Sequence, residues 1–133
     1  MTLSEIQEQV MFQSNNDADD LGDFLPHIGD YINEGYDRIV TVWDNNHVPS
    51  DAYPKLEEDD DEPSLPGWMH RYIADWATWL IYRNGNPQKQ NRGMAYRNSF
   101  YELMSKISDA GGKAGLNEDG TPKQYKNFVN IPE

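Results

Sequence analysis

The segment LPGWMHRYIADWATWLIYRN, residues 65–84, contains the most extensive apolar pattern of the chain. One apolar stripe recurs every three or four residues, as on a single face of an α-helix, and consists of Met69, Ile73, Trp76 and Leu80. Further aromatic side chains widen this stripe, namely Trp68, Tyr72, Trp79 and Tyr82. We therefore predict a helix from Pro66 to about Arg83 that contacts other elements on two sides and lies in the middle of a bundle.

Shorter signals predict one helix at the start of the chain and one at its end. Thr2 with Glu5 forms a capping-box pattern before the helical spacing of Leu3, Ile6 and Val10. The sequence Gly85-Asn86-Pro87 ends the aromatic helix and starts the last one, which should run to about Asp109 before Gly111 and Gly112. So short a connection favours an antiparallel helix pair. Gly93 inside the last helix costs about 1 kcal/mol relative to alanine and weakens the signal there.

A long amphipathic helix is predicted between these, from about Phe24 to Trp43, with Asp23 as its cap and Pro26 in its first turn. Its polar face includes Glu34 and Arg38, which are spaced for an ion pair. The fold class predicted from these patterns is all-α: a small antiparallel bundle of about four helices within residues 1–112.

Residues 44–65 separate the second helix from the aromatic helix, and their composition opposes packing and regular structure. They include three prolines and six consecutive acids: Glu57, Glu58, Asp59, Asp60, Asp61 and Glu62. We expect a long, exposed acidic loop, which could be simply solvated, could clamp a basic partner or could mimic nucleic acid.

Residues 113–133 are polar and rich in glycine and proline until four late apolar positions: Tyr125, Phe128, Val129 and Ile131. This pattern is typical of an extended C-terminal tail that docks on another protein. The alternative is a tail that folds back on its own bundle.

Charge is distributed very unevenly along the 133 residues, whose formal net charge is −12. Residues 1–62 hold 17 acidic and 2 basic residues, whereas residues 63–133 hold 6 and 9. Such asymmetry favours a surface that meets a differently charged one in a partner or in another copy. The acidic total argues against gripping a phosphate backbone, and the apolar runs are too short for a membrane helix.

Signals for catalysis and for cofactors are weak. His27, His47 and His70 lack metal-ligand spacing, and Asp17, Asp19 and Gly22 only hint at a calcium loop. Asp30 and Glu34 could serve as the acid and base of a hydrolase, but such pairs are more often a solvated stripe. We therefore expect no enzyme activity, no cofactor and no metal.

The aromatic helix could stack nucleic-acid bases, yet it lacks interleaved basic residues, so core or subunit contact is favoured. The subunit-interface candidates are Trp68, Arg71, Tyr72, Trp79 and Arg83.

Three sequence blocks resemble the head-to-tail adaptor (connector) proteins of tailed bacteriophages. They are TLSEIQEQV, LPHIGDYINEGYDRIV and LPGWMHRYIADWATWLIYRN, the last followed by a helix that begins at Pro87. The resemblance covers roughly residues 2–43 and 65–107. Within it, Ile32, Asn33, Glu34 and Tyr36 match a core segment of the second helix, and Leu65-Pro66 matches the start of the third. Many relatives have a β-hairpin where residues 44–64 are acidic and proline-rich here.

The resemblance implies a structural virion protein at the head-tail junction, assembled in the host cytoplasm. Its relatives form a ring, commonly dodecameric, that docks under the portal protein and meets a tail or stopper protein. The C-terminal segment would dock on the portal, and an acidic channel would let DNA pass without specific binding. The free protein should be a monomer or a loose oligomer. The alternative from a different class is an acidic inhibitor or DNA mimic that binds a basic nucleic-acid enzyme.

Overall fold

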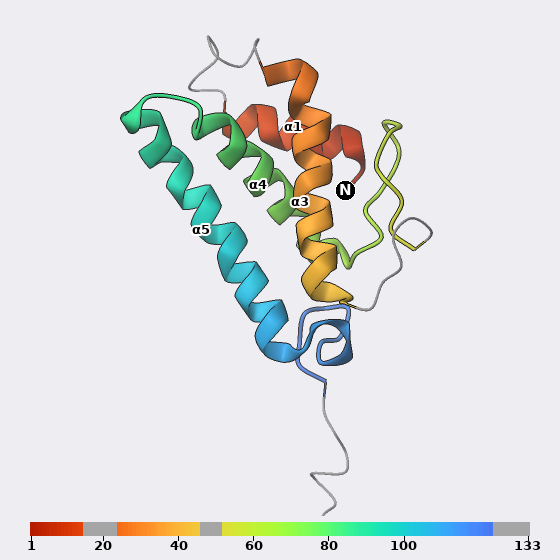
Figure 1. The fold of residues 1–133 in the computed structure, drawn as a ribbon. Helices are drawn as coiled ribbons and strands as arrows, with labels where there is room; N and C mark the ends of the chain where they lie inside the picture. The colour runs from red at the N-terminus through yellow and green to blue at the C-terminus, as the bar shows by residue number, and fades with distance from the viewer. Residues whose placement is uncertain (15–23, 46–51, 124–133) are drawn as a thin grey trace, which may run out of the picture.

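The computed structural model describes residues 1–14, 24–45 and 52–123. In these ranges the chain forms four α-helices and three short 3-10 helices, and an isolated bridge from Leu116 to Pro122 is the only β pairing (Figure 1). The α-helices are α1 (Leu3–Gln13), α3 (Ile28–Trp43), α4 (His70–Tyr82) and α5 (Pro87–Ala110). The 3-10 helices are η2 (Leu25–His27), η3 (Gly67–Met69) and η4 (Gly112–Ala114). The prediction of a small all-α bundle is confirmed.

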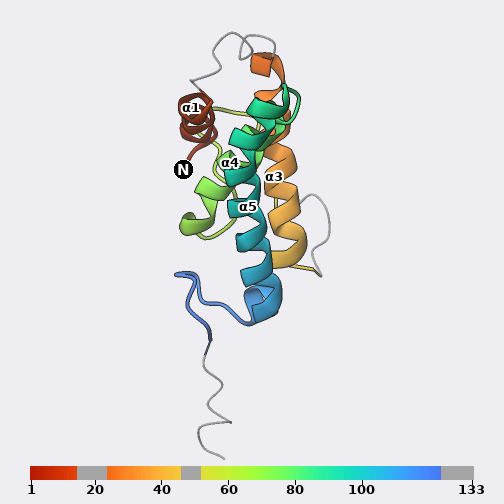
Figure 2. The ribbon, with the colours of Figure 1, turned by 90° about the vertical axis from the view of Figure 1, so that its left-hand side faces the viewer.

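Helix α4 occupies the middle of the bundle and contacts α1, α3 and α5. Figure 1 shows α3 and α5 on either side of it, and Figure 2 shows α1 and α3 on opposite sides of it. The stripe predicted from the sequence is buried: Met69 and Ile73 have no exposed surface, and Leu80 is 1% exposed. The wide apolar pattern of α4 thus reflects contacts with three helices, which confirms its predicted central place.

The helix ends follow the local signals, with two shifts. Thr2 and Glu5 form the predicted capping box, and the Asn86 side chain accepts a hydrogen bond from the Lys89 amide at 2.9 Å. A 3-10 turn forms around Pro26 and another after Pro66, so α3 and α4 begin a few residues later than predicted. Asp23, the predicted cap, lies outside the described residues.

Two glycines allow α4 to approach its neighbours closely. A Cβ atom at Gly93 of α5 would lie 2.5 Å from the Tyr82 Cβ, and one at Gly35 of α3 would lie 3.1 Å from the Trp76 Cβ. Gly93, which weakens the helix signal in the sequence, is therefore buried at the α4–α5 contact. The cost in helix propensity is offset by closer packing of the two helices.

Residues 113–123 differ from the extended tail expected from position 113. They form η4 and a tight turn, in which the Asn117 amide donates to the Thr121 carbonyl at 2.8 Å. Leu116 is 3% exposed and belongs to the hydrophobic core, so the expected boundary at residue 112 does not separate two bodies. Because this leucine fills the end of the bundle, the alternative of a chain folding back on its own helices describes residues 113–123. The apolar tail positions Tyr125, Phe128, Val129 and Ile131 lie outside the described residues.

Candidate interaction surfaces

The acidic segment is anchored to the bundle, and the expectation that its composition opposes packing was wrong. Leu56 and Leu65 are buried in the core at 3% and 8% exposure. Asn33 of α3 accepts a hydrogen bond from the Leu56 amide at 2.8 Å and donates one to the Leu56 carbonyl at 3.0 Å. Farther along, the Ser64 amide donates to the Tyr36 hydroxyl at 2.9 Å. Isolated apolar residues among the acids and prolines thus hold the segment against α3.

Asp61 organises the tip of this acidic loop. Its carboxylate accepts hydrogen bonds from the amides of Glu57 and Glu58, each at 2.8 Å. Hydrogen bonds from Glu58 and Glu57 lower the pKa of Asp61 below its ordinary value of 3.8. The backbone carbonyls of the loop are used as well, since those of Asp61 and Asp59 accept the amides of Leu3 and Ser4 in the first turn of α1. One acid of the six therefore shapes the loop.

The other five acids of the run are displayed outward by this arrangement. Four of them are exposed at the loop tip or its flank, namely Glu57, Glu58, Asp59 and Asp60. Glu62 is exposed too, and its carboxylate lies 3.4 Å from the N-terminal ammonium of Met1. The predicted exposure of the carboxylates is thus confirmed. We call Glu57–Glu62 the acidic tip.

His70 lies beside the acidic tip and is buried at the start of α4. Its Nδ1 is 2.8 Å from the Met1 ammonium, and its Nε2 is 2.8 Å from the Leu65 carbonyl. Burial lowers the pKa of His70 below its ordinary value of 6.5. A neutral ring fits both contacts, because Nε2–H donates to the carbonyl while Nδ1 accepts from the ammonium. His70 therefore positions the chain between the loop and α4, which is a structural role.

The five aromatic and basic interface candidates from the sequence do not form one surface. Trp68 is half-buried under Gly120, and the Lys106 ammonium lies 4.7 Å from the centroid of its ring. Arg71 lies over the Tyr72 ring at 4.7 Å and donates to the Tyr72 hydroxyl at 2.8 Å. These contacts hold the three side chains within the chain, but the buried indole N–H of Trp68 has no hydrogen-bond partner among the described residues.

Trp79 and Arg83 are the remaining two of these candidates. Trp79 is half-buried against α5, where its ring lies close to Gly93, and Arg83 is exposed at the end of α4. Of the five, Trp79 alone joins the surface described next.

A surface that the sequence did not reveal combines two arginines with three aromatic rings. The Arg38 guanidinium lies 4.5 Å from the centroid of Trp76, and that of Arg97 lies 5.1 Å from Tyr101 and 5.8 Å from Trp79. The Tyr101 ring meets the edge of Trp76 at a centroid distance of 5.9 Å. We call Arg38, Trp76, Trp79, Arg97 and Tyr101 the arginine–aromatic surface, in which Trp76 is only 3% exposed and supports its neighbours from the core side. It draws on α3, α4 and α5. The basic residues that α4 lacks between its aromatic side chains are supplied by Arg38 of α3 and Arg97 of α5.

Glu34 holds this surface together at its α3 side. Its carboxylate accepts the Trp76 indole N–H at 2.5 Å and lies 3.7 Å from the Nε of Arg38. The Glu34–Arg38 pair at helical spacing was predicted, whereas the link to Trp76 was not. Because Glu34 is committed to these contacts, it is poorly suited to the acid–base role weighed for it with Asp30.

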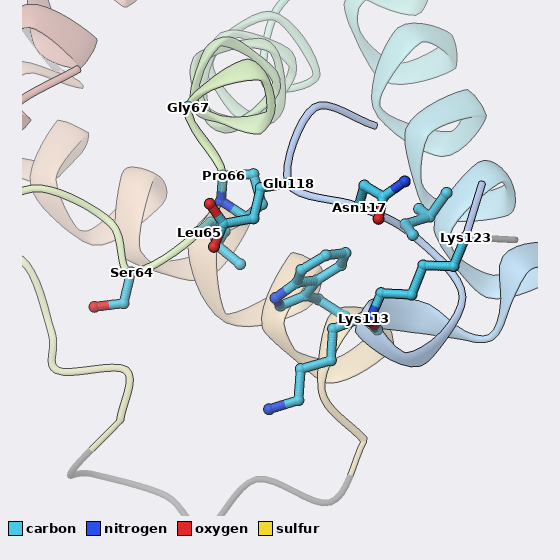
Figure 3. Close-up of a pocket in the computed structure, with 10 residues that line it drawn as sticks. Ser64, Leu65, Pro66, Gly67, Lys113, Asn117, Glu118 and Lys123 are labelled. Atoms are coloured by element: carbon cyan, nitrogen blue, oxygen red, sulfur yellow. The ribbon is translucent and has the colours of Figure 1, made fainter. Parts of the chain in front are cut away.

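An open cleft of about 630 Å³ lies at the end of the bundle where the described chain stops (Figure 3). Trp43, Leu65, Pro66 and Leu116 line it on the apolar side. Lys113 and Lys123, at its rim, are held by the chain itself: the Lys113 ammonium is 2.8 Å from the Asp44 carboxylate, and that of Lys123 donates to the Lys113 carbonyl at 2.9 Å. The lysines at the rim of the cleft are thus fixed by contacts within the chain.

A buried polar network joins three helices at Asp75 of α4. Its carboxylate accepts hydrogen bonds from Gln13 of α1 at 3.0 Å and from Ser99 of α5 at 2.9 Å. Thr78 donates to the Gln13 side chain at 2.6 Å, and Tyr82 donates to its backbone carbonyl at 3.2 Å. Burial raises the pKa of Asp75, which the hydrogen bonds from Ser99 and Gln13 partly oppose. With every partner inside the protein, this network ties α1, α4 and α5 together.

Within the described residues, no group of three or more His, Cys, Asp or Glu side chains could hold a metal ion. The weak calcium-loop pattern at residues 17–22 and His47 lie outside those residues. Nor does any described helix combine the length and apolar character needed to cross a membrane. No protein-family model, curated protein or solved structure matches the chain.

Proposed function

We propose that this protein is a structural component of a tailed-bacteriophage virion, which forms a ring under the portal protein and connects the head to the tail. It carries out no catalysis and needs no cofactor in this role. Its surfaces bind copies of itself, the portal protein and a tail or stopper protein, while DNA passes through the ring.

The observation that carries the proposal is the presence of two unlike, preorganised surfaces in a small bundle. The acidic tip is fixed by Asp61 and anchored through Asn33, and the arginine–aromatic surface is fixed by ring stacking and Glu34. Rigid surfaces lose little conformational entropy when they bind. A protein that blocks one basic cleft needs only the first surface, whereas a ring subunit between two neighbours needs both.

The order of the elements is a second support. A short helix, a long helix, a third helix preceded by Leu65-Pro66 and a last helix that begins at Pro87 follow each other as in the adaptor resemblance. The matched residues on α3 also have core or tethering contacts: Ile32 is fully buried, Asn33 holds Leu56 and Tyr36 holds Ser64. These positions therefore carry the fold of such a subunit.

The net charge of the chain also suits the proposed channel. Carboxylates repel the phosphates of DNA, and this protein carries a formal net charge of −12. A ring of so acidic a chain lets a duplex slide, because its net negative charge repels the phosphate backbone.

The test is docking on the portal protein of the same phage, observed by electron microscopy and sedimentation. The full chain should appear as a ring on the portal. A variant with Tyr125→Ala, Phe128→Ala and Ile131→Ala should dock at least about tenfold more weakly, because it loses the apolar anchors of the tail. A matched variant with Lys126→Ala and Asn127→Ala should dock nearly as well as the full chain.

Absence of any complex between the full chain and the portal would contradict the proposal. Tight, salt-sensitive binding to a basic nucleic-acid enzyme without a ring would favour the acidic inhibitor instead.

A further inference from the structure

The arginine–aromatic surface has the composition of a binding hot spot. Trp, Tyr and Arg are the residue types that contribute most binding energy at protein interfaces. Tyr101 is 40% exposed, and the Arg38 side chain is 46% exposed. Arg97 is only half-buried although it contacts two rings. The surface therefore presents cationic groups that are held in place yet reachable from outside.

The geometry of its arginines selects a carboxylate partner. A guanidinium that lies over an aromatic ring has one face covered, and its N–H edge stays directed sideways. That edge matches the two oxygens of a carboxylate, so the preferred partner is an acidic protein segment. A phosphate fits the same edge, so a nucleic acid is the competing partner.

The acidic tip of the same chain has the complementary chemistry. It displays five outward carboxylates on a loop whose turn is already formed by Asp61. It is not able to reach the arginine–aromatic surface of its own molecule, because Asn33 and Tyr36 anchor the loop on the side of α3 away from α5. Figure 1 shows this separation, with the loop on the right of α3 and α5 on the left.

We infer that the acidic tip of one copy docks on the arginine–aromatic surface of the next copy. This inference rests on the proposed ring and names the contact between its neighbouring subunits. Since the two surfaces differ and lie on opposite sides of α3, each copy offers both halves of the contact. Such a heterologous contact propagates from copy to copy and closes into a ring when the rotation fits.

Two charge-reversed variants test the pairing. The first carries Arg38→Glu and Arg97→Glu, and the second carries Glu57→Lys, Glu58→Lys and Asp60→Lys. Asp61 is kept in both because it forms the turn. Circular dichroism and thermal unfolding establish that each variant is folded.

Self-association is measured by sedimentation velocity at about 0.02 M and about 0.5 M salt, with protein up to about 1 mM. The wild type should associate more strongly at low salt. Each variant alone should associate at least about tenfold more weakly, because the first then has two acidic surfaces and the tip of the second has lost its net negative charge. An equimolar mixture of the two variants should recover association, since each supplies the partner that the other lacks.

A matched control reverses two charges outside the contact, through Arg83→Glu and Arg92→Glu. It has the same net charge as the first variant and should associate like the wild type. A wild type that stays monomeric under all these conditions, variants that associate unchanged, or a mixture that fails to recover would each overturn the inference. A surface that instead takes up single-stranded DNA in the same measurement would overturn it as well.

Failure of this inference is distinguishable from failure of the proposed function. Both charge-reversed variants retain residues 124–133, so single copies should still bind the portal protein. Portal binding without self-association through these surfaces would leave the adaptor role standing and remove only the subunit contact.

Discussion

Asn33 joins α3 to the acidic loop with one side chain. Its amide donates to the carbonyls of Gly29 and Leu56 and accepts the Leu56 amide. Glu34 and Tyr36, on the same helix, hold Trp76 and Ser64. Each of these three polar residues thus replaces water with a fixed partner, which keeps the loop and α4 in register with α3.

Asp75 provides a prediction at the same scale. In the unfolded chain its pKa is near 3.8, and burial raises the pKa in the folded protein. The folded protein therefore binds a proton at Asp75 more tightly than the unfolded chain does. The free energy of unfolding that this proton contributes is fully present below pH 3.8 and is lost as the pH rises through the folded pKa of Asp75. At neutral pH the protein carries the cost of a buried charge.

Asp75→Asn removes this charge and keeps the shape of the side chain. It should unfold in urea at pH 7 with a free energy equal to or above that of the wild type, and this component of the pH dependence should vanish. Asp75→Ala should lose about 1–3 kcal/mol, because it leaves Gln13 and Ser99 without their buried partner. Equal destabilisation by both substitutions would show that the negative charge itself is required.

The local sequence defines where a helix forms, whereas tertiary contacts set its distance from the neighbouring helices. α4 is defined locally by its apolar spacing, but its distance from α3 and α5 depends on Gly35 and Gly93. In the acidic loop, tertiary contacts override the preference of the local sequence. Its composition favours solvent, yet Leu56 and Leu65 anchor it in the core.

The role of close helix packing is tested by two glycine substitutions in helices. Gly93→Ala should lower the free energy of unfolding by about 1–3 kcal/mol, since its Cβ would meet Tyr82 and Trp79. Gly29→Ala is the matched control, because nothing lies within 4 Å of a Cβ at that position. It should raise stability by up to about 1 kcal/mol through better helix propensity. Urea unfolding checks both, and stabilisation by Gly93→Ala would contradict the packing account.

At the scale of the whole molecule, the described chain closes its bundle with residues 113–123. Leu116 joins the core, and Asp44 at the end of α3 accepts hydrogen bonds from Lys113 and Tyr53, both at 2.8 Å. Burial, assisted by Asp44, raises the pKa of Tyr53 to about 12. This end of the molecule is therefore part of the folded body, and the docking tail of the proposed function begins after it.

Two truncations test where the folded body ends. A chain that stops at Lys123 should keep the helical circular dichroism and the urea midpoint of the full protein. A chain that stops at Gly112 should lose about 2–3 kcal/mol, chiefly because Leu116 no longer covers the core. Equal stability of the two truncated chains would show that residues 113–123 do not contribute to the fold.

The sequence by itself determined the helices, their caps and the charge asymmetry, because these depend on residues three or four positions apart or on composition. The capping box at Thr2, the turn at Asn86 and the apolar stripe of α4 are of this kind. Tertiary structure alone decided the anchoring of the acidic loop and the arginine–aromatic surface. Glu34 and Trp76 are 42 residues apart, and Asn33 and Leu56 are 23 apart. Contacts over such separations arise only when the helices pack, so no local pattern records them.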